Sequence, residues 1–155
     1  TLSVDTIQGQ TTAANVKLPV GSVIQVVQGT TATRVAISTG TYTFTGLTAS
    51  ITPKFNNSKI LVQIEQAGCL ATIGNTGDIN MRLQRNSSDI YNFALAYFYG
   101  DSPQHRAGIS GCYLDSPSTT NATTYKLQFK AGGGGSAFVQ FQSVPTQMYL
   151  MEVLA

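Results

Sequence analysis

Short runs in which apolar and polar residues alternate constrain this sequence more than any other feature. The clearest are Lys59–Gln66, Asp78–Arg85 and Thr123–Lys130. Successive side chains of a β-strand point to opposite faces, so each run predicts a strand with one apolar face. No stretch of ten or more residues has the spacing of an amphipathic helix, and the sequence therefore predicts an all-β fold. The residues expected on the apolar faces are Ile60, Val62 and Ile64; Ile79, Met81 and Leu83; and Tyr125, Leu127 and Phe129.

Further strand-like runs are separated by turn-forming residues along the rest of the chain. They are Ser22–Gln28, Arg34–Ser38, Thr41–Thr45, Leu47–Thr52, Ile90–Tyr99, Ile109–Leu114, Ala137–Val144 and Met148–Leu154. Gly74–Gly77 indicates a hairpin turn, and Gly100–Gly108, which contains Pro103, predicts an exposed loop. About nine or ten short strands with regular turns predict a β-sandwich, plausibly with jelly-roll connectivity. Two of the runs, Ser22–Gln28 and Met148–Leu154, are apolar on both faces, which favours burial of the second face by another subunit.

The low charge of the chain excludes several classes of partner. Charged residues make up only 10% of the 155 residues, and the net charge is +2. A charge this small does not suit a nucleic-acid binder, and no apolar run approaches the ~18 residues of a membrane span. A weakly charged surface favours coverage by copies of the same chain or by partners; a plain polar β-domain is the alternative.

The first eighteen residues differ from the rest of the chain. They contain one short strand-like run, Leu2–Ile7, followed by a polar stretch, and they lack enough apolar residues to pack alone. We therefore expect residues 1–18 to form an extended N-terminal arm and residues 19–155 a single β-sandwich domain. The apolar side chains of Leu2, Val4 and Ile7 are the candidate contacts of this arm with a partner, and strand addition to a foreign sheet edge is the expected mode.

The residues that usually carry catalysis are sparse. His105 is the only histidine, no G-x-S-x-G motif is present, and the seven acidic residues are scattered singly, so neither a Ser-His-Asp arrangement nor a carboxylate pair is indicated. The spacing of Cys and His does not suit zinc, and Gly132–Gly135 lacks the Lys-Ser/Thr and the helix of a phosphate loop. Asn75–Asp78 fits a hairpin turn better than a weak cation site. The sequence predicts a protein that is not an enzyme, with no cofactor and no metal.

One aromatic-rich region is a candidate for surface recognition. Tyr97, Tyr99, Asp101, His105 and Arg106 lie in or beside the expected loop, where tyrosines next to polar groups could contact a host surface glycan. Burial of these rings in the core or in an interface is the alternative.

The two cysteines, Cys69 and Cys112, lie 43 positions apart, each beside a glycine in a strand-like segment. We expect them to be buried and unpaired, although the sequence leaves a disulfide open.

Five stretches bear a resemblance to a known family: Leu18–Val27, Ser58–Val62, Tyr113–Pro117, Thr119–Gln128 and the opening Leu2–Gln8. The first four resemble β-rich virion proteins of tailed phages, especially cyanophages, and the opening is similar to the N-terminal arms of such modules. The resemblance covers most of the chain, and it implies a structural protein without catalytic residues. Proteins of this kind are usually trimers, so the resemblance implies a homotrimer.

Two settings are known for such modules. One is a capsid decoration (cement) protein, which binds the major capsid protein on the outer surface of the phage head. The other is a short tail or neck fibre, or a receptor-binding tip. A compact domain with an arm and without a shaft favours decoration of the head, and the protein would then be made in the host cytoplasm and end in the virion.

Overall fold

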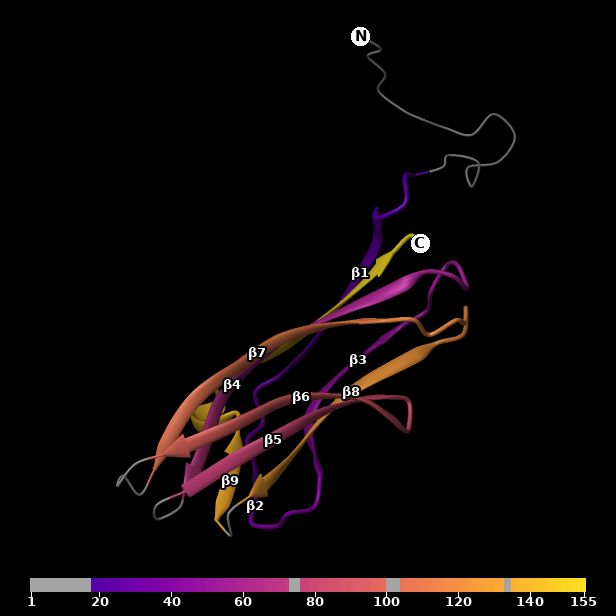
Figure 1. The fold of residues 1–155 in the computed structure, drawn as a ribbon. Helices are drawn as coiled ribbons and strands as arrows, with labels where there is room; N and C mark the ends of the chain where they lie inside the picture. Colours follow the sequence, from indigo (N-terminus) through magenta and orange to yellow (C-terminus); the bar gives the residue numbers. More distant parts are fainter. Residues whose placement is uncertain (1–17, 73–75, 100–103, 133–134) are drawn as a thin grey trace, which may run out of the picture.

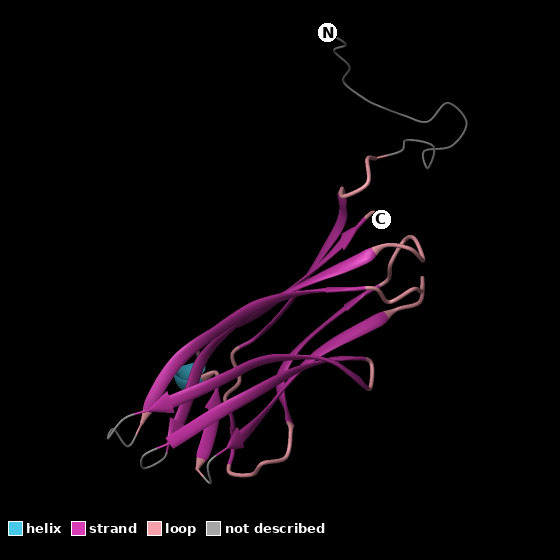
Figure 2. Ribbon diagram, viewed as in Figure 1, coloured by secondary structure: helices cyan, strands magenta, loops and turns pink. Residues whose placement is uncertain are grey.

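The computed structural model describes residues 18–72, 76–99, 104–132 and 135–155, and the side chains of these residues except 76–77 and 94–99. Strands make up most of the described chain, and a single short 3-10 turn lies among them (Figure 2). The elements are β1 (Val23–Thr31), β2 (Val35–Ile37), β3 (Thr43–Ile51), β4 (Lys59–Thr72), β5 (Thr76–Arg85), β6 (Ser88–Tyr99), β7 (His105–Asp115), β8 (Thr123–Gly132), β9 (Ser136–Val139), the 3-10 turn η2 (Phe141–Ser143) and β10 (Thr146–Val153).

The strands form two antiparallel sheets that pack as a sandwich (Figure 1). Sheet A has the order β1-β10-β4-β9-β2, with β7 on the other side of β4, and sheet B has the order β3-β8-β5-β6. Both β9 and β10 pair with β4, end to end, and β2 and β1 pair with them in turn. Sheet A is therefore four strand lines wide, because β1 with β2 and β9 with β10 each form one interrupted line.

This order confirms the predicted all-β sandwich and its jelly-roll connectivity. Along the chain the strand lines alternate between the two sheets, except that β5 and β6 form a hairpin within sheet B. Sheet A thus contains the lines β1/β2, β9/β10, β4 and β7, and sheet B contains β3, β8, β5 and β6, which is the arrangement of a jelly roll.

The core lies between the sheets and consists of the side chains that alternation placed on the apolar faces. All nine predicted residues of β4, β5 and β8 are buried, from Ile60 to Phe129. β10 adds Met148 and Leu150. At one side of the sandwich the Tyr91 ring of β6 stacks on the Tyr113 ring of β7, with 4.6 Å between ring centroids, and so joins an edge strand of each sheet.

Three of the predicted boundaries that differ from the structure do so for a clear physical reason. The runs Thr41–Thr45 and Leu47–Thr52 form one strand, β3, because the backbone passes through Gly46 with φ +87° and a register shift rather than a turn. The predicted loop Gly100–Gly108 is wrong at its end, because β7 begins at His105 and pairs with Ala71 of β4. The predicted strand Ala137–Val144 ends at Val139, because Gln140 takes a left-handed φ of 50° and leads into η2.

The described chain enters and leaves the sandwich at the same end (Figure 1). The backbone N–H of Gly21 donates to the carbonyl of Leu154 at 2.8 Å, and the N–H of Leu154 donates to the carbonyl of Ser22 at 3.0 Å. Among the described residues, no helix is long and apolar enough to cross a membrane.

Candidate interaction surface

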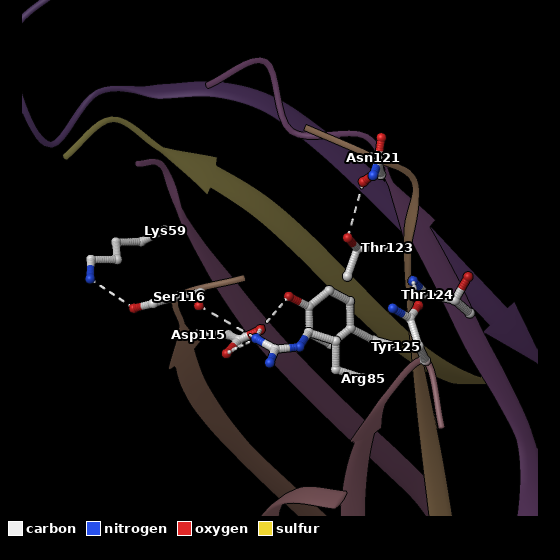
Figure 3. Close-up of polar contacts among 9 residues, drawn as sticks. Lys59, Arg85, Asp115, Ser116, Asn121, Thr123, Thr124 and Tyr125 are labelled. Atoms are coloured by element: carbon white, nitrogen blue, oxygen red, sulfur yellow. Dashed lines mark hydrogen bonds and ion pairs between the residues drawn. The ribbon is translucent and has the colours of Figure 1, made fainter. Parts of the chain in front are cut away.

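The strongest polar cluster of the described chain connects the two sheets at one end. The Asp115 carboxylate, at the end of β7, accepts hydrogen bonds from Arg85 Nη1 of β5 at 3.0 Å to each oxygen and from the Tyr125 hydroxyl of β8 at 2.6 Å (Figure 3). Nearby, Lys59 Nζ donates to Ser116 Oγ at 2.7 Å. Burial, with the hydrogen bond to the Asp115 carboxylate as a second cause, raises the pKa of the Tyr125 hydroxyl above its usual range.

This cluster does not have the composition of a reaction centre. Its acid, cation and phenol satisfy one another, and a phenol with a raised pKa stays protonated as a donor. Among the described residues, no group of three or more His, Cys, Asp or Glu side chains could hold a metal ion. We interpret the cluster as a polar link between the sheets.

A second buried acid was also not singled out from the sequence. Glu152 of β10 is fully buried, and its Oε1 accepts hydrogen bonds from the backbone N–H groups of Lys54 at 2.8 Å and Phe55 at 3.2 Å. Gln25 of β1 donates its side-chain amide to the other carboxylate oxygen. The carboxylate thus fixes the loop between β3 and β4 against sheet A.

The outer face of sheet A carries a continuous apolar row. In the strand registers Val26 lies opposite Met151, Met151 opposite Leu61, and Leu61 opposite Leu114, so the four side chains share one face across all four strand lines. Their neighbours Val27, Leu150, Ile60 and Val62 point into the core, which places the row on the outside. Val26 is 58% exposed and Leu114 54% exposed at the two ends of the row. We call these four residues the outer row.

The surroundings of the outer row are uncharged on the side away from the termini. The next row consists of Gln28, Tyr149, Gln63 and Cys112. Toward the termini lies a row that contains Val23, Val153 and Lys59, and the side chains of Leu18 and Val20 are exposed near it. Leu18, which follows the expected N-terminal arm, therefore lies at the end of sheet A where Val23 pairs with Val153.

The outer face of sheet B has a different character. Its strands turn Arg82, Lys126 and Lys130 outward, while Met81, Leu127 and Phe129 point into the core. Arg82 also pairs with Asp89, and its guanidinium lies 4.1 Å from the centroid of the Tyr42 ring. Charged side chains thus cover the middle of one outer face, whereas the apolar row crosses the other.

The predicted recognition residues are only partly described. Tyr97 and Tyr99 belong to β6, but their side chains lie outside the described part, as does Asp101. His105 and Arg106 are in β7 rather than in a loop, which corrects the prediction. Because side chains alternate along a strand, Arg106 points outward and His105 points inward, so the two do not share a face.

The arm lies outside the described residues as well, and with it Leu2, Val4 and Ile7. These three residues remain candidates from the sequence alone.

The two cysteines confirm one prediction and contradict another. Both are unpaired, as expected. Cys69 is buried, and burial raises the pKa of its thiol to about 12. Cys112 is exposed on the outer face of β7, in the row next to the outer row. The prediction that Cys112 is buried is wrong for the single chain, because Cys112 alternates with the inward-facing Tyr113 and so lies on the outer face of sheet A.

Comparisons with known proteins find similarity only among solved structures. No family model matches the sequence, and no curated protein matches it significantly. Among solved structures, the fold is similar to a structure of the infectious bursal disease virus Gt strain, with 14% identity, a TM-score of 0.43, and coverage of 84% of this chain and 38% of that chain. It is also similar to the infectious bursal disease virus VP2 subviral particle, with 15% identity, a TM-score of 0.37, and coverage of 86% and 39%. This chain thus spans less than half of either protein, and similarities at this level carry no conclusion about function.

Proposed function

We propose that this chain is a non-enzymatic structural protein of a bacteriophage virion, and that it assembles as a homotrimer through the outer face of sheet A. The observation that carries the proposal is the outer row, Val26, Met151, Leu61 and Leu114, which crosses the whole sheet without a charge. The resemblance of the sequence to phage virion proteins supports the same assignment, and it implies an assembly of three copies of the chain.

Burial of this row would stabilise an assembly. A Val or Leu side chain contributes ~1.5–3 kcal/mol when it is fully buried, so each half-exposed end residue of the row has about 1 kcal/mol still to gain. A continuous apolar strip flanked by polar groups is typical of an interaction site. A second copy of this chain suits the strip, because around a threefold axis the Val26 end of the strip on one copy can meet the Leu114 end of the strip on the next, so that apolar surface covers apolar surface.

The finer proposal is that the protein decorates the phage head from outside and binds the major capsid protein through residues 1–18. What supports it is the exposure of the apolar side chains of Leu18 and Val20 at the end of sheet A that lies next to the arm. In this arrangement Leu2, Val4 and Ile7 would contact the capsid, and the jelly roll would form the exposed body.

A short tail or neck fibre, or a receptor-binding tip, is the second candidate. It is favoured by a separate observation, the exposed Arg34 and Arg106 side chains on the same outer face. A tip of this kind would contact a glycan of the host surface.

Sedimentation velocity at micromolar concentration tests self-association. We expect a species of about 49 kDa, three times the 16.4 kDa of the chain, and a loss of this species in the double variant Val26→Asn, Leu114→Asn. Phe44→Asn is the matched control, because Phe44 is a similarly exposed apolar residue on sheet B. A 16.4 kDa species alone, or dissociation by Phe44→Asn but not by the double variant, would refute the proposed interface.

Deletion of residues 1–17 tests the attachment. The truncated protein should remain a trimer and fail to bind virus particles. Full occupancy of the truncated protein on particles would show that the arm does not anchor it, and localisation by antibody would separate head decoration from a fibre.

A further inference from the structure

We propose that Arg34, Arg106 and Phe141 form a binding site for an oxyanion carried by a saccharide. The two guanidinium groups lie on the same aromatic ring: the Cζ of Arg34 is 5.5 Å and that of Arg106 is 4.9 Å from the centroid of Phe141. Arg34 also lies 4.6 Å from the centroid of Phe138. Two exposed cations thus converge on one platform of two phenyl rings, whose centroids are 6.1 Å apart.

Arg34 and Arg106 differ from the other two arginines of the chain in their ion pairing. Arg82 pairs with Asp89, and Arg85 pairs with Asp115. Within the described ranges neither Arg34 nor Arg106 has a carboxylate partner, and Glu65, which faces outward from β4, makes no ion pair with them. A planar guanidinium offers several N–H donors in a fixed fork that matches a carboxylate or a phosphate. Stacking on a ring leaves the edge of this fork free for such a group.

The backbone that presents Phe141 is strained, and it is held by specific contacts. Gln140, Gln142 and Ser143, on both sides of Phe141, have left-handed φ values of 50°, 62° and 56°. Such values are costly for residues other than glycine, and they concentrate at functional sites. The buried side-chain amide of Gln140 is hydrogen-bonded to that of Gln66, which anchors the turn in the sandwich.

The facing strand is shaped to admit this turn. Gly68 lies at a bulge in β4 with φ +60°, and a Cβ there would lie 2.6 Å from the backbone nitrogen of Phe141. Bulges next to binding sites often redirect side chains. Here the bulge allows η2 to approach β4 and brings Phe141 to Arg106, which lies in the same row of sheet A as Phe138.

The surface beside the rings favours a saccharide over a simple ion. A shallow hollow of about 240 Å³ adjoins Phe138 and is lined by Ala36, Ile37, Ser38 and Ser136. The two serine hydroxyls can donate to and accept from sugar hydroxyls, while the apolar groups suit the face of a sugar ring. The acid group itself, a carboxylate of a uronic acid or a phosphate on a sugar, would be bound by the two arginines.

The site is remote from the proposed contact between copies. Arg106 and Leu114 lie eight residues apart on β7, which corresponds to roughly 26 Å at ~3.3 Å per residue. The site can therefore stay accessible when the outer row is buried, and its function does not depend on the trimer.

Titration calorimetry with the full chain tests the proposal. The probes are a tetrasaccharide of galacturonic acid, glucose 6-phosphate, maltotetraose as the neutral control, and inorganic phosphate, all at the same ionic strength. We expect the galacturonate or the sugar phosphate to bind at least tenfold more tightly than maltotetraose and inorganic phosphate, and the stronger of the two anionic saccharides identifies the acid group. Arg34→Gln and Arg106→Gln should each weaken this binding about tenfold or more. Arg82→Gln, which removes a stacked arginine that already has a carboxylate partner, should leave it unchanged.

Three results would overturn the proposal. They are the absence of binding by both anionic saccharides, binding that survives Arg34→Gln and Arg106→Gln, and equal binding of inorganic phosphate, which would reduce the site to a general anion site. The melting temperature of each variant shows whether the fold is intact. Arg34→Lys and Arg106→Lys retain the charge but lack the guanidinium fork, so a folded variant of this kind should bind with an affinity between those of the wild type and the Gln variant. The sedimentation test is independent of all these outcomes.

Discussion

Asp115→Asn should destabilise the protein by about 2–4 kcal/mol, because it removes a buried charge on which two other side chains depend. In the native protein Arg85 Nη1 lies 3.0 Å from both carboxylate oxygens, and the Tyr125 hydroxyl lies 2.6 Å from Oδ2. Asparagine is neutral and replaces one oxygen with a group that can only donate, so Arg85 loses the charge of its partner and one of its two acceptors. A hydrogen bond to a charged group contributes ~1.5–3 kcal/mol, and we take the lower part of this range for Arg85, whose side chain is 29% exposed.

Tyr125→Phe completes a double-mutant cycle for this cluster. It removes one hydroxyl and should cost about 1.5–3 kcal/mol. The double variant should lose at least ~1 kcal/mol less than the sum of the single losses, because the hydroxyl and the carboxylate contact each other directly. The assay is urea unfolding followed by circular dichroism at one fixed protein concentration, since association would change the apparent stability. A loss below ~0.5 kcal/mol for Asp115→Asn, or strictly additive losses, would refute the role assigned to the cluster.

Three further perturbations have expected outcomes that urea unfolding can measure. Gly68→Ala should cost about 2–4 kcal/mol of stability, because the new Cβ would lie 2.6 Å from the Phe141 nitrogen on a backbone with φ +60°. The control Gly108→Ala should change stability by less than ~1 kcal/mol, because the nearest atom to its Cβ would lie 3.8 Å away. Equal losses for the two variants would contradict the close approach of Phe141 to Gly68. Wild-type stability should fall as pH rises from 9.0 to about 12, because the unfolded Cys69 thiol ionises in this window and the buried thiol stays protonated. Cys69→Ala should remove up to roughly 4 kcal/mol of this decline, and an unchanged pH profile would argue against the burial of the thiol. Glu152→Gln should cost about 1–3 kcal/mol through weaker hydrogen bonds to the β3–β4 loop, and a neutral effect would show that the carboxylate does not hold that loop.

The sequence predicted the fold where the information is local. Alternation identified the core faces of β4, β5 and β8, because a strand buried on one side must place its apolar residues at every second position. The number and spacing of the strands predicted a β-sandwich and made jelly-roll connectivity plausible, and the strand order in the structure is that of a jelly roll.

The errors occur where distant segments decide the conformation. Polar residues around Pro103 predicted a loop up to Gly108, but pairing with β4 makes a strand from His105 onward. The end of β9 depends on the left-handed Gln140, whose side chain is buried against Gln66, 74 positions earlier. No window of neighbouring residues contains this information.

The same reason limited the prediction of sites. Asp115 and Glu152 read as isolated acids, because Arg85, Tyr125 and the loop at Lys54 come from other strands. The outer row could be anticipated only as an excess of apolar residues in two runs, since Leu61 and Leu114 join it through strand register. Arg106 was a candidate for recognition, whereas its partners Arg34 and Phe141 carry no local signal.

Alkylation of Cys112 in the native protein tests the proposed contact between copies most directly. Cys112 is exposed in the single chain and lies in the row beside the outer row, whereas Cys69 is buried and serves as an internal control. Intact mass after brief treatment with a bulky maleimide counts the labelled thiols at each protein concentration. We expect labelling of Cys112 to slow as the protein associates, and the double variant Val26→Asn, Leu114→Asn to restore fast labelling at every concentration. Fast labelling of Cys112 in a fully associated wild-type sample would show that the outer face of sheet A is not the surface through which the copies meet.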